Sequence, residues 1–222
     1  GCSDLTAITI PDSVTSFEGN AFSNLENLTA ITIPDSVTSI GESAFSGCTS
    51  LTKIAIPNSV TDIGGFVFSN CTNLESITLS DHLTSVGGYT FSGCTSLSAI
   101  TIPDSVTSIG DNAFSDCSGL TEITIPDSVT SIRAGTFSNC SGLTEITIPD
   151  SVTSIGGSTF LKTPWLTAKQ AENPLVIVNH ILIDGKTCTG AVSIPNGVTS
   201  IGDDAFYNCS GLTEITIPDS VT

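Results

Sequence analysis

The sequence predicts a repeat solenoid built mostly of β-structure, and three observations support this prediction. A unit of 23 residues recurs along the 222-residue chain without insertions, and fixed periods of about 20 to 50 residues are typical of stacked repeat arrays. Each unit contains segments in which polar and β-branched apolar residues alternate, as in half-buried strands. The large apolar residues of one unit cannot be buried within it, so successive units must stack. We therefore expect residues 1–222 to form a single solenoid domain.

The first half of the unit predicts a strand followed by a turn. With Cys117 as position 0, one copy reads CSGLTEITIPDSVTSIRAGTFSN over residues 117–139. Positions 4 to 8, such as Thr121–Ile125, alternate polar and apolar residues, and the two Ile are expected to face inward. Pro at position 9 lacks an amide hydrogen, so it ends the strand at the same place in each copy. Asp-Ser at positions 10 and 11 suits a turn.

The second half of the unit predicts a shorter strand and a compact turn. Positions 12 to 15, such as Val129–Ile132, place Val and Ile at inward positions, and Gly at position 16 breaks this strand in most copies. Phe recurs at position 20, as in Phe114 and Phe137. We interpret positions 16 to 22 as a short helical turn that inserts Phe into the core. Stacked units then align Leu, Ile, Val and Phe in continuous ladders.

The cysteines are expected to be buried, reduced thiols. Leu25, Thr163 and Lys186 replace Cys in some copies, so position 0 does not require a disulfide partner. Side chains stacked about 5 Å apart are also farther apart than the Cβ atoms of a disulfide, about 3.8 Å. The alternative is that some of them form disulfides, and Cys188, two residues out of register, could be exposed. The Cys at position 0 are Cys2, Cys48, Cys71, Cys94, Cys117, Cys140 and Cys209.

Charge and hydropathy exclude two classes of partner. The chain has 22 Asp plus Glu against 5 Lys plus Arg, a formal charge of −17, and no basic cluster that could contact a phosphate backbone. Nucleic acid and anionic membrane surfaces are therefore not expected as partners. No apolar run approaches the roughly 20 residues that span a bilayer, so we expect no membrane insertion.

The copy at 163–185 keeps the length of the unit but changes its chemistry. Lys169 and Ala171 replace the inward Ile pair, which predicts that the first strand is lost here. Thr163 as N-cap and Pro164 as the first helical residue predict a short helix that ends before Pro174.

A hairpin is expected after this helix. The apolar runs 175–178 and 181–183 flank Asn179-His180, a pair that suits a tight turn. Counting from Thr163 places Leu175, Val178 and Ile183 at the positions of the inward Val, Ile and Phe.

Two interpretations of this irregular copy remain open. It contains Trp165, the only Trp of the chain, and Lys169, while Lys162 and Lys186 flank it. One interpretation is a ligand-binding site that includes Trp165, Lys169 and His180. The other is that Trp165 fills the space left by the missing Ile pair and the lysines are solvated, because large aromatic side chains are mostly buried.

The repeated pattern L-x-x-I-x-I-P-x-x-V-x-x-I-G-x-x-A-F-x-x-C resembles the leucine-rich repeat of the BspA-like, or Treponema-type, class. The resemblance covers essentially the whole chain and includes the irregular Thr163–Trp165 segment. It implies a leucine-rich-repeat horseshoe, a right-handed superhelix with a parallel sheet on its concave face. Members of the class are secreted or surface proteins of bacteria and some protists, and several are adhesins. One fold hosts many functions, so adhesion is here an implication of the resemblance.

No catalytic, metal or cofactor site is expected. Only His82 and His180 are available as histidine bases, and they lie about a hundred residues apart. Most copies offer one Asp at position 10, as in Asp104, and Asn58 and Asn196 replace it in two others, whereas Ca²⁺ takes six to eight oxygen ligands. We interpret this Asp as a turn residue and the protein as a non-enzyme.

The outward positions 5 and 7 of the first strand form the expected contact surface of the regular copies. This surface is rich in Thr and lacks the Trp, Tyr and Arg that dominate binding hot spots. We take as candidate ligand-binding residues Lys53, Thr78, Thr101, Glu122 and Thr124, together with Trp165, Lys169 and His180 of the irregular copy.

Two functions fit this surface. The first is a binding or adhesion module of a secreted or cell-surface protein, which recognises a host or matrix protein or a glycan. The second is a passive stalk or spacer of a larger surface protein, which nearly identical copies would serve. Both place the chain outside the cell or on its surface.

The ends of the chain lack atypical polar repeats. Residues 1 and 222 both fall within a unit, and solenoids need capping repeats for solubility. We expect a part of a longer protein, whose signal peptide and anchor lie elsewhere, and self-association through the uncapped ends.

The interpretation of the Asp column gives a first prediction. Because each Asp serves a turn and no ion is required, the melting temperature is expected to be the same in excess EDTA and in added Ca²⁺. Differential scanning calorimetry in the two buffers measures this. A higher melting temperature in Ca²⁺ alone would show that the column binds the ion.

Overall fold

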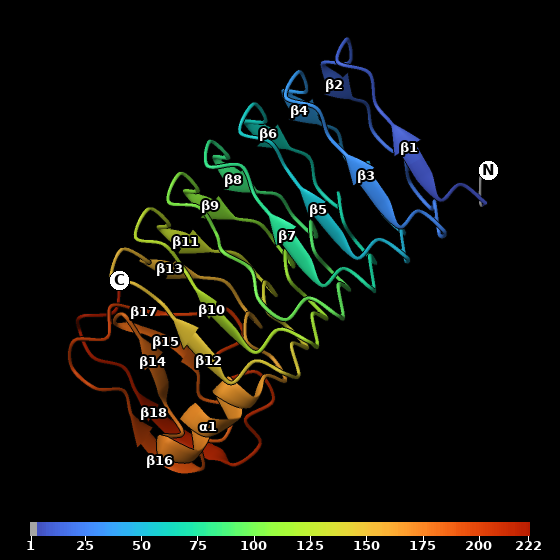
Figure 1. The fold of residues 1–222 in the computed structure, drawn as a ribbon. Helices are drawn as coiled ribbons and strands as arrows, with labels where there is room; N and C mark the ends of the chain where they lie inside the picture. The colour runs from blue at the N-terminus through green and yellow to red at the C-terminus, as the bar shows by residue number, and fades with distance from the viewer. Residues whose placement is uncertain (1–3) are drawn as a thin grey trace.

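The chain is a stack of coils that lie side by side along one axis (Figure 1). The computed structural model describes residues 4–222, so Cys2 lies outside the described residues. Most regular coils contribute to two rows of short strands, and the strands that pair within a row are parallel. The predicted parallel β-solenoid is therefore confirmed.

The first-strand row corresponds to unit positions 5 to 7 and the second-strand row to positions 14 and 15. The first-strand row comprises β1 (Ala7–Thr9), β3 (Ala30–Thr32), β5 (Lys53–Ala55), β7 (Ser76–Thr78), β10 (Glu122–Thr124), β12 (Glu145–Thr147), β16 (Gly190–Ser193) and β18 (Leu212–Thr216). The second-strand row comprises β2 (Ser16–Phe17), β4 (Ser39–Ile40), β6 (Asp62–Ile63), β8 (Ser85–Val86), β9 (Ser108–Ile109), β11 (Ser131–Ile132), β13 (Ser154–Ile155) and β17 (Ser200–Ile201).

Pairing in the regular coils keeps the 23-residue register. Ile8 lies opposite Ile31 and Ser131 opposite Ser154. The first-strand row is divided into the pairs β1–β3, β5–β7, β10–β12 and β16–β18, and it is interrupted between β7 and β10, where residues 99–101 form no strand. A depression on the surface of this row, described below, is lined by residues of this strandless segment and of the next coil.

The core consists of ladders of identical side chains, as predicted. Consecutive Phe rings from Phe22 to Phe160 lie 5.2 to 5.9 Å apart with nearly parallel planes. The Leu side chains of position 3 form a second ladder, and those between Leu28 and Leu143 are fully buried. Each side chain is buried by its equivalents in the coils before and after it, so stability comes from neighbouring coils.

The segment expected as a short helical turn is instead a run of β-turns. Two residues per coil, such as Asn20 (φ 60°) and Asn24 (φ 56°), adopt left-handed backbone conformations that interrupt a right-handed helix. The amides of Asn20 and Phe22 donate to carbonyl oxygens of the next coil, at 2.8 Å each. A helix would use these amides within itself. The pairing of coil with coil therefore decides the local conformation.

Two of the left-handed positions hold large aromatic residues, which we call the aromatic pair. Phe66 has φ 58° and Tyr89 has φ 56°. Their rings stack with centroids 4.6 Å apart and planes 4° apart. A left-handed conformation costs a non-glycine residue on the order of 1–3 kcal/mol, while an aromatic stack contributes about 0.5–1.5 kcal/mol beyond its buried area. The free energy gained from the one stack is therefore smaller than the summed conformational cost at the two residues.

The irregular copy has the helix and hairpin that the sequence predicts. Helix α1 (Pro164–Glu172) begins at Thr163, whose hydroxyl oxygen accepts from the amide of Leu166, and ends at Asn173. Strands β14 (Val176–Val178) and β15 (Ile181–Asp184) are antiparallel. Asn179 and His180 between them both have positive φ, as a two-residue type I′ turn requires.

The register through this copy differs from the prediction. Leu182 of β15 lies opposite Ile201, 19 residues later, so Leu182 and not Val178 takes the inward position of the second-strand row. Gly185 takes the place of Phe, because its amide donates to Ala205 as the Phe amides do elsewhere, and Phe206 covers it. The 23-residue register returns at Ala191, which lies opposite Glu214. The hairpin adds four residues relative to a regular copy, and the segment that follows is shorter by four residues. Counting in steps of 23 residues therefore misplaced Val178 and Ile183.

The seven described cysteines are free thiols, as expected. The thiols of the regular column donate to Phe carbonyl oxygens, for example Cys94 to Phe68 at 3.2 Å and Cys140 to Phe114 at 3.0 Å. Burial raises the pKa of Cys71 from 9.0 to about 12. Cys188 is only 3% exposed, so the suggestion that it is exposed is wrong; the turn that restores the register carries it back into the core.

The buried thiols generate a prediction about alkaline pH. Because the pKa of Cys71 is higher in the folded chain, its stabilising effect is complete below pH 9 and lost as the pH rises toward 12. At pH 10.5 this thiol is expected to lower the free energy of unfolding by about 2 kcal/mol relative to pH 8. Urea unfolding of the wild type and of Cys71→Ala at both values isolates this contribution. Equal losses in the two proteins would contradict it.

Candidate binding surface

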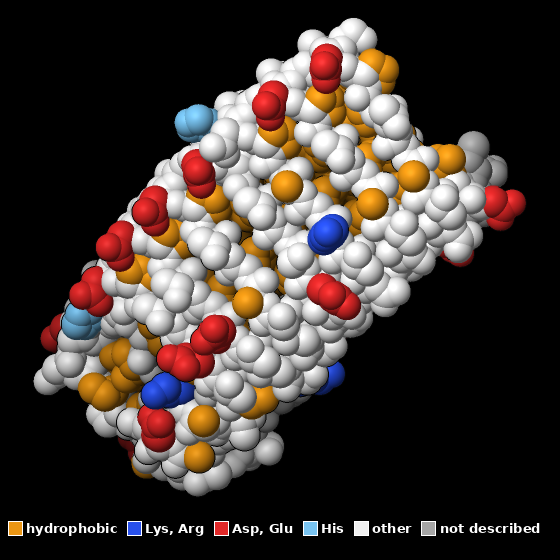
Figure 2. Space-filling model, viewed as in Figure 1, with side chains coloured by type: hydrophobic (Ala, Val, Ile, Leu, Met, Phe, Trp, Pro, Cys, Tyr) orange, Lys and Arg blue, Asp and Glu red, His pale blue; other side chains and the backbone are white. Residues whose placement is uncertain are grey.

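The side chains at positions 5 and 7 form one exposed surface, which we call the first-strand face. Alternation along each strand turns Ile inward and these residues outward. Figure 2 shows this face as a long hollow with hydrophobic side chains on its floor and a row of acidic side chains along one edge. The described residues that point outward in the regular coils are Ala7, Thr9, Ala30, Thr32, Lys53, Ala55, Ser76, Thr78, Ala99, Thr101, Glu122, Thr124, Glu145, Thr147, Ala191, Ser193, Glu214 and Thr216, all exposed.

Besides a depression of about 610 Å³ between the paired strands β1 and β3, this face has one of about 450 Å³ beside the strandless residues 99–101. Ile100 and Ile102 of one coil and Ile123 of the next contribute to its lining. Thr101, Glu122 and Thr124, three of the residues selected from the sequence, line it together with Asp104 and Pro126. This depression therefore combines apolar surface with two hydroxyls and two carboxylates.

Lys53 and Thr78 lie on the same face but outside this depression. They belong to β5 and β7, which precede the interruption, and both side chains are exposed. The structure therefore brings three of the five candidates of the regular coils together and leaves these two as neighbours along the face.

The structure does not gather the three candidates of the irregular copy. Trp165 is 8% exposed, and its ring centroid lies 4.6 Å from that of Phe160, at the end of the Phe ladder. Lys169 forms an ion pair with Glu172 at 2.9 Å on the surface of α1. His180 is exposed at the hairpin turn, where its Nδ1 lies 3.0 Å from the carbonyl oxygen of Gly197. The position of Trp165 favours the packing interpretation.

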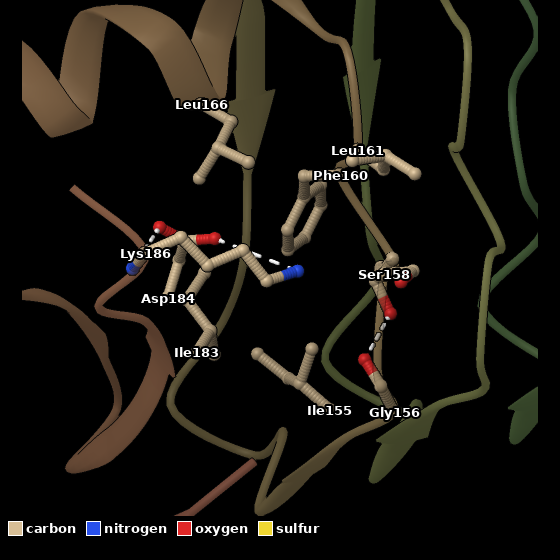
Figure 3. A pocket seen from close by; sticks show the side chains of 10 residues that line it. Ile155, Gly156, Ser158, Phe160, Leu161, Leu166, Ile183, Asp184 and Lys186 are labelled. Atoms are coloured by element: carbon tan, nitrogen blue, oxygen red, sulfur yellow. Dashed lines mark hydrogen bonds and ion pairs between the residues drawn. The ribbon is translucent and has the colours of Figure 1, made fainter. Parts of the chain in front are cut away.

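A buried carboxylate, that of Asp184, links helix α1 to the hairpin; Figure 3 shows it beside Lys186 at a small cavity. Asp184 is 3% exposed, and its Oδ1 accepts from Gln170 Nε2 at 2.8 Å and from the backbone amide of Lys186 at 3.2 Å. Lys186 Nζ lies 4.0 Å from Oδ2. The adjacent cavity, of about 20 Å³, has room for little more than one water molecule. This cluster therefore fits a structural joint, that is, a set of contacts that holds helix α1 to the hairpin.

Comparison with known proteins identifies the family. The model of the BspA-type leucine-rich repeat region matches residues 1–120, 66–182 and 185–222, with six copies. The chain belongs to this BspA-type family. No curated protein matches the sequence.

Three solved structures of leucine-rich repeat proteins are similar to this member of the BspA-type family. The protein from T. pallidum is 31% identical, with a TM-score of 0.69 over 72% of this chain and 77% of its own. The protein from Bacteroides ovatus is 27% identical, with a TM-score of 0.63 over 98% of this chain and 56% of its own. A leucine-rich cell surface protein from Faecalibacterium prausnitzii is 31% identical, with a TM-score of 0.50 over 98% of this chain and 74% of its own.

Over residues 4–222, no three His, Cys, Asp or Glu side chains come together in a way that could hold a metal ion. No helix in the same residues is long and apolar enough to cross a membrane. Leucine-rich repeat proteins of this kind are generally non-catalytic.

Sequence reasoning missed the aromatic pair. The candidates of the regular coils come from the outward strand positions, whereas Phe66 and Tyr89 lie at position 18, in the β-turn segment. The signal was present, because the other regular copies within residues 4–222 have Asn, Ser, Gly or Asp at this position and only these two have aromatic residues. The expected helical turn gave no reason to look for a left-handed position there or for the exposure of Phe66 and Tyr89.

The joint at Asp184 generates a prediction. Asp184→Ala leaves the Gln170 amide and the Lys186 amide without their buried acceptor, so the free energy of unfolding is expected to fall by about 1–3 kcal/mol. Glu172→Ala, which breaks the exposed ion pair with Lys169, is expected to change it by less than about 1 kcal/mol. Urea unfolding of both variants tests this. Similar losses in the two variants would show that Asp184 is no joint.

Proposed function

We propose that this chain is a non-catalytic binding or adhesion module of a secreted or cell-surface protein, which recognises a protein or glycan through the first-strand face. The observation that carries the proposal is the depression at the interruption of the first-strand row. It offers apolar surface and polar groups together, and specific recognition sites combine these two features.

The chemistry of this face supports broad rather than deep contact. Thr101 and Thr124 can donate and accept hydrogen bonds, and the carboxylates of Asp104 and Glu122 accept them. Thr recurs at position 7 in neighbouring strands, such as β10 and β12. A partner can therefore make many weak contacts that add along the axis, which suits adhesion better than capture of a small molecule.

The arrangement of the histidines fits a non-catalytic function. Nδ1 of His82 lies 2.8 Å from the carbonyl oxygen of Asn58, and Nδ1 of His180 lies near that of Gly197. Both imidazoles thus contact backbone oxygens through Nδ1. A nucleophile, base and orienting group held in one constellation would support catalysis, and the first-strand face offers Thr, Asp and Glu for binding instead.

A passive stalk is the second candidate function, because neighbouring coils repeat the same exposed side chains. Glu122 and Thr124 of β10 are repeated as Glu145 and Thr147 of β12. A stalk needs uniform coils, whereas a binding module depends on the coils that form the depression.

Charge reversal tests the binding module. Glu122→Lys places a cation in the depression and is expected to weaken binding to a partner at least tenfold, about 1.4 kcal/mol. Asp116→Lys makes the same charge change in the β-turn segment, at a unit position that Lys162 occupies in another coil, and is expected to change affinity less than twofold. Surface plasmon resonance against matrix proteins and glycan arrays at micromolar concentration provides the measurement.

Removal of residues 94–139 separates the two candidates. This deletion removes two units, including the depression, and joins coils in register. A binding module loses its partner, whereas a stalk shortens and keeps whatever the remaining protein binds. Equal effects of the two Lys variants, or no partner at all, would count against the binding module.

A further inference from the structure

The aromatic pair is a surface feature that is separate from the first-strand face. Phe66 and Tyr89 follow β6 and β8 of the second-strand row (Figure 1). Each residue is 38% exposed, although every other Phe between Phe45 and Phe160 is buried. Their rings stack on each other, so the ring edges and the two outer ring faces remain for contact.

The residues that directly precede the two aromatic residues carry no side chains. Each aromatic residue follows two glycines, Gly64-Gly65 and Gly87-Gly88. A Cβ at Gly64 would lie 2.5 Å from the backbone nitrogen of Glu42, so close coil packing explains that glycine. At Gly65 a Cβ would lie 3.1 Å from the Gly88 carbonyl oxygen, a tight fit, although other coils hold Glu42 and Asp111 at this unit position. The absence of side chains at Gly65 and Gly88 widens access to the rings.

The backbone conformation argues that the rings serve more than the turn. Position 18 is left-handed in each regular coil, and Asn at Asn20 and Asn112 meets this requirement with less strain than a bulky residue. The stack does not offset the strain at both residues. Strained positions cluster at functional sites, and exposed aromatic residues are enriched at interfaces.

The charges around the pair indicate the kind of partner. Glu42 and Asp111 lie at position 17 of the coils before and after it. The amide of Tyr89 donates to the Asp111 carbonyl at 2.9 Å, and the amide of Ser43, next to Glu42, donates to Gly65 at 2.9 Å, so both acidic residues belong to adjoining turns. Asp111 has a partner in Arg133, at 3.5 Å, and Glu42 is exposed. The Phe66 side is therefore the more acidic side of the pair.

We propose that the aromatic pair, with Glu42, binds Lys or Arg side chains of a polypeptide partner. A cation over an aromatic ring face is attracted by the ring quadrupole, and a neighbouring carboxylate adds a charge-assisted hydrogen bond. The net charge of −17 draws a basic segment toward the molecule and speeds its association. A neutral glycan gains nothing from this charge, so the observations favour a cationic polypeptide.

A labelled decapeptide of alternating Arg and Gly tests the proposal by fluorescence polarisation. The control peptide carries citrulline, which is uncharged, in place of Arg. Phe66→Asn/Tyr89→Asn is the main variant, since Asn occupies this position in other coils and should keep the fold. Tyr207→Asn removes a 63% exposed aromatic residue elsewhere and is the matched control.

The double variant is expected to bind the Arg peptide at least about tenfold more weakly, and Tyr207→Asn within about twofold of the wild type. Glu42→Gln is expected to weaken binding about threefold and to reduce its salt dependence. The wild type should bind the citrulline peptide at least about tenfold more weakly than the Arg peptide. Equal binding of the two peptides, or by the double variant and the wild type, would overturn the proposal.

Three further readouts keep the outcome unambiguous. The melting temperature of the double variant is expected to match or exceed that of the wild type, because strain is relieved; if it unfolds, Tyr89→Asn alone replaces it. If Glu122→Lys abolishes peptide binding more strongly than Asp116→Lys while the double variant still binds, the peptide occupies the first-strand face and this proposal alone fails. Binding of maltohexaose, lost in the double variant, without peptide binding would assign the pair to glycans and overturn it as well.

Discussion

Every part of this molecule depends on the in-register contact between one coil and the next. Backbone amides of each coil donate to carbonyl oxygens of its neighbour, for example Thr38 to Thr15 at 2.9 Å. The same register places Phe on Phe and Leu on Leu, which buries side chains that a single coil leaves exposed. It also decides local structure, since the β-turn segment gives up helical hydrogen bonds in order to bond between coils. Where the two conflict, the hydrogen bonds between coils therefore determine the structure of a segment, and its own conformational preference does not.

The sequence predicted those features that repeat identically in every unit. The inward Leu, Ile and Phe, the strand rows, the free thiols and the helix cap at Thr163 all follow from periodicity or from a local signal. The position of Leu182 could not be found by counting, because the extra residues of the hairpin and the shorter turn after it cancel over two copies. The aromatic pair was missed because the sign of φ at position 18 depends on contacts between coils.

The candidate site was predicted in part, for a related reason. Alternation along the strand identified Thr101, Glu122 and Thr124 as outward residues, and the structure places them in one depression. Alternation says nothing about where depressions form along this face, so it could not separate these residues from Lys53 and Thr78. In the irregular copy, a unique Trp indicated a special position, and that position proved to be the end of the Phe ladder.

The place of Trp165 has a spectroscopic consequence. The buried residues form two clusters: Trp165 belongs to the larger one, and the smaller one contains Leu182, Cys188 and Ile194. Because the chain has a single Trp, its tryptophan emission comes entirely from the boundary between the clusters, whereas circular dichroism averages over all coils. The molecule thus carries an intrinsic fluorescent probe at its irregular coil. Fluorescence and circular dichroism together measure how cooperatively the two clusters melt.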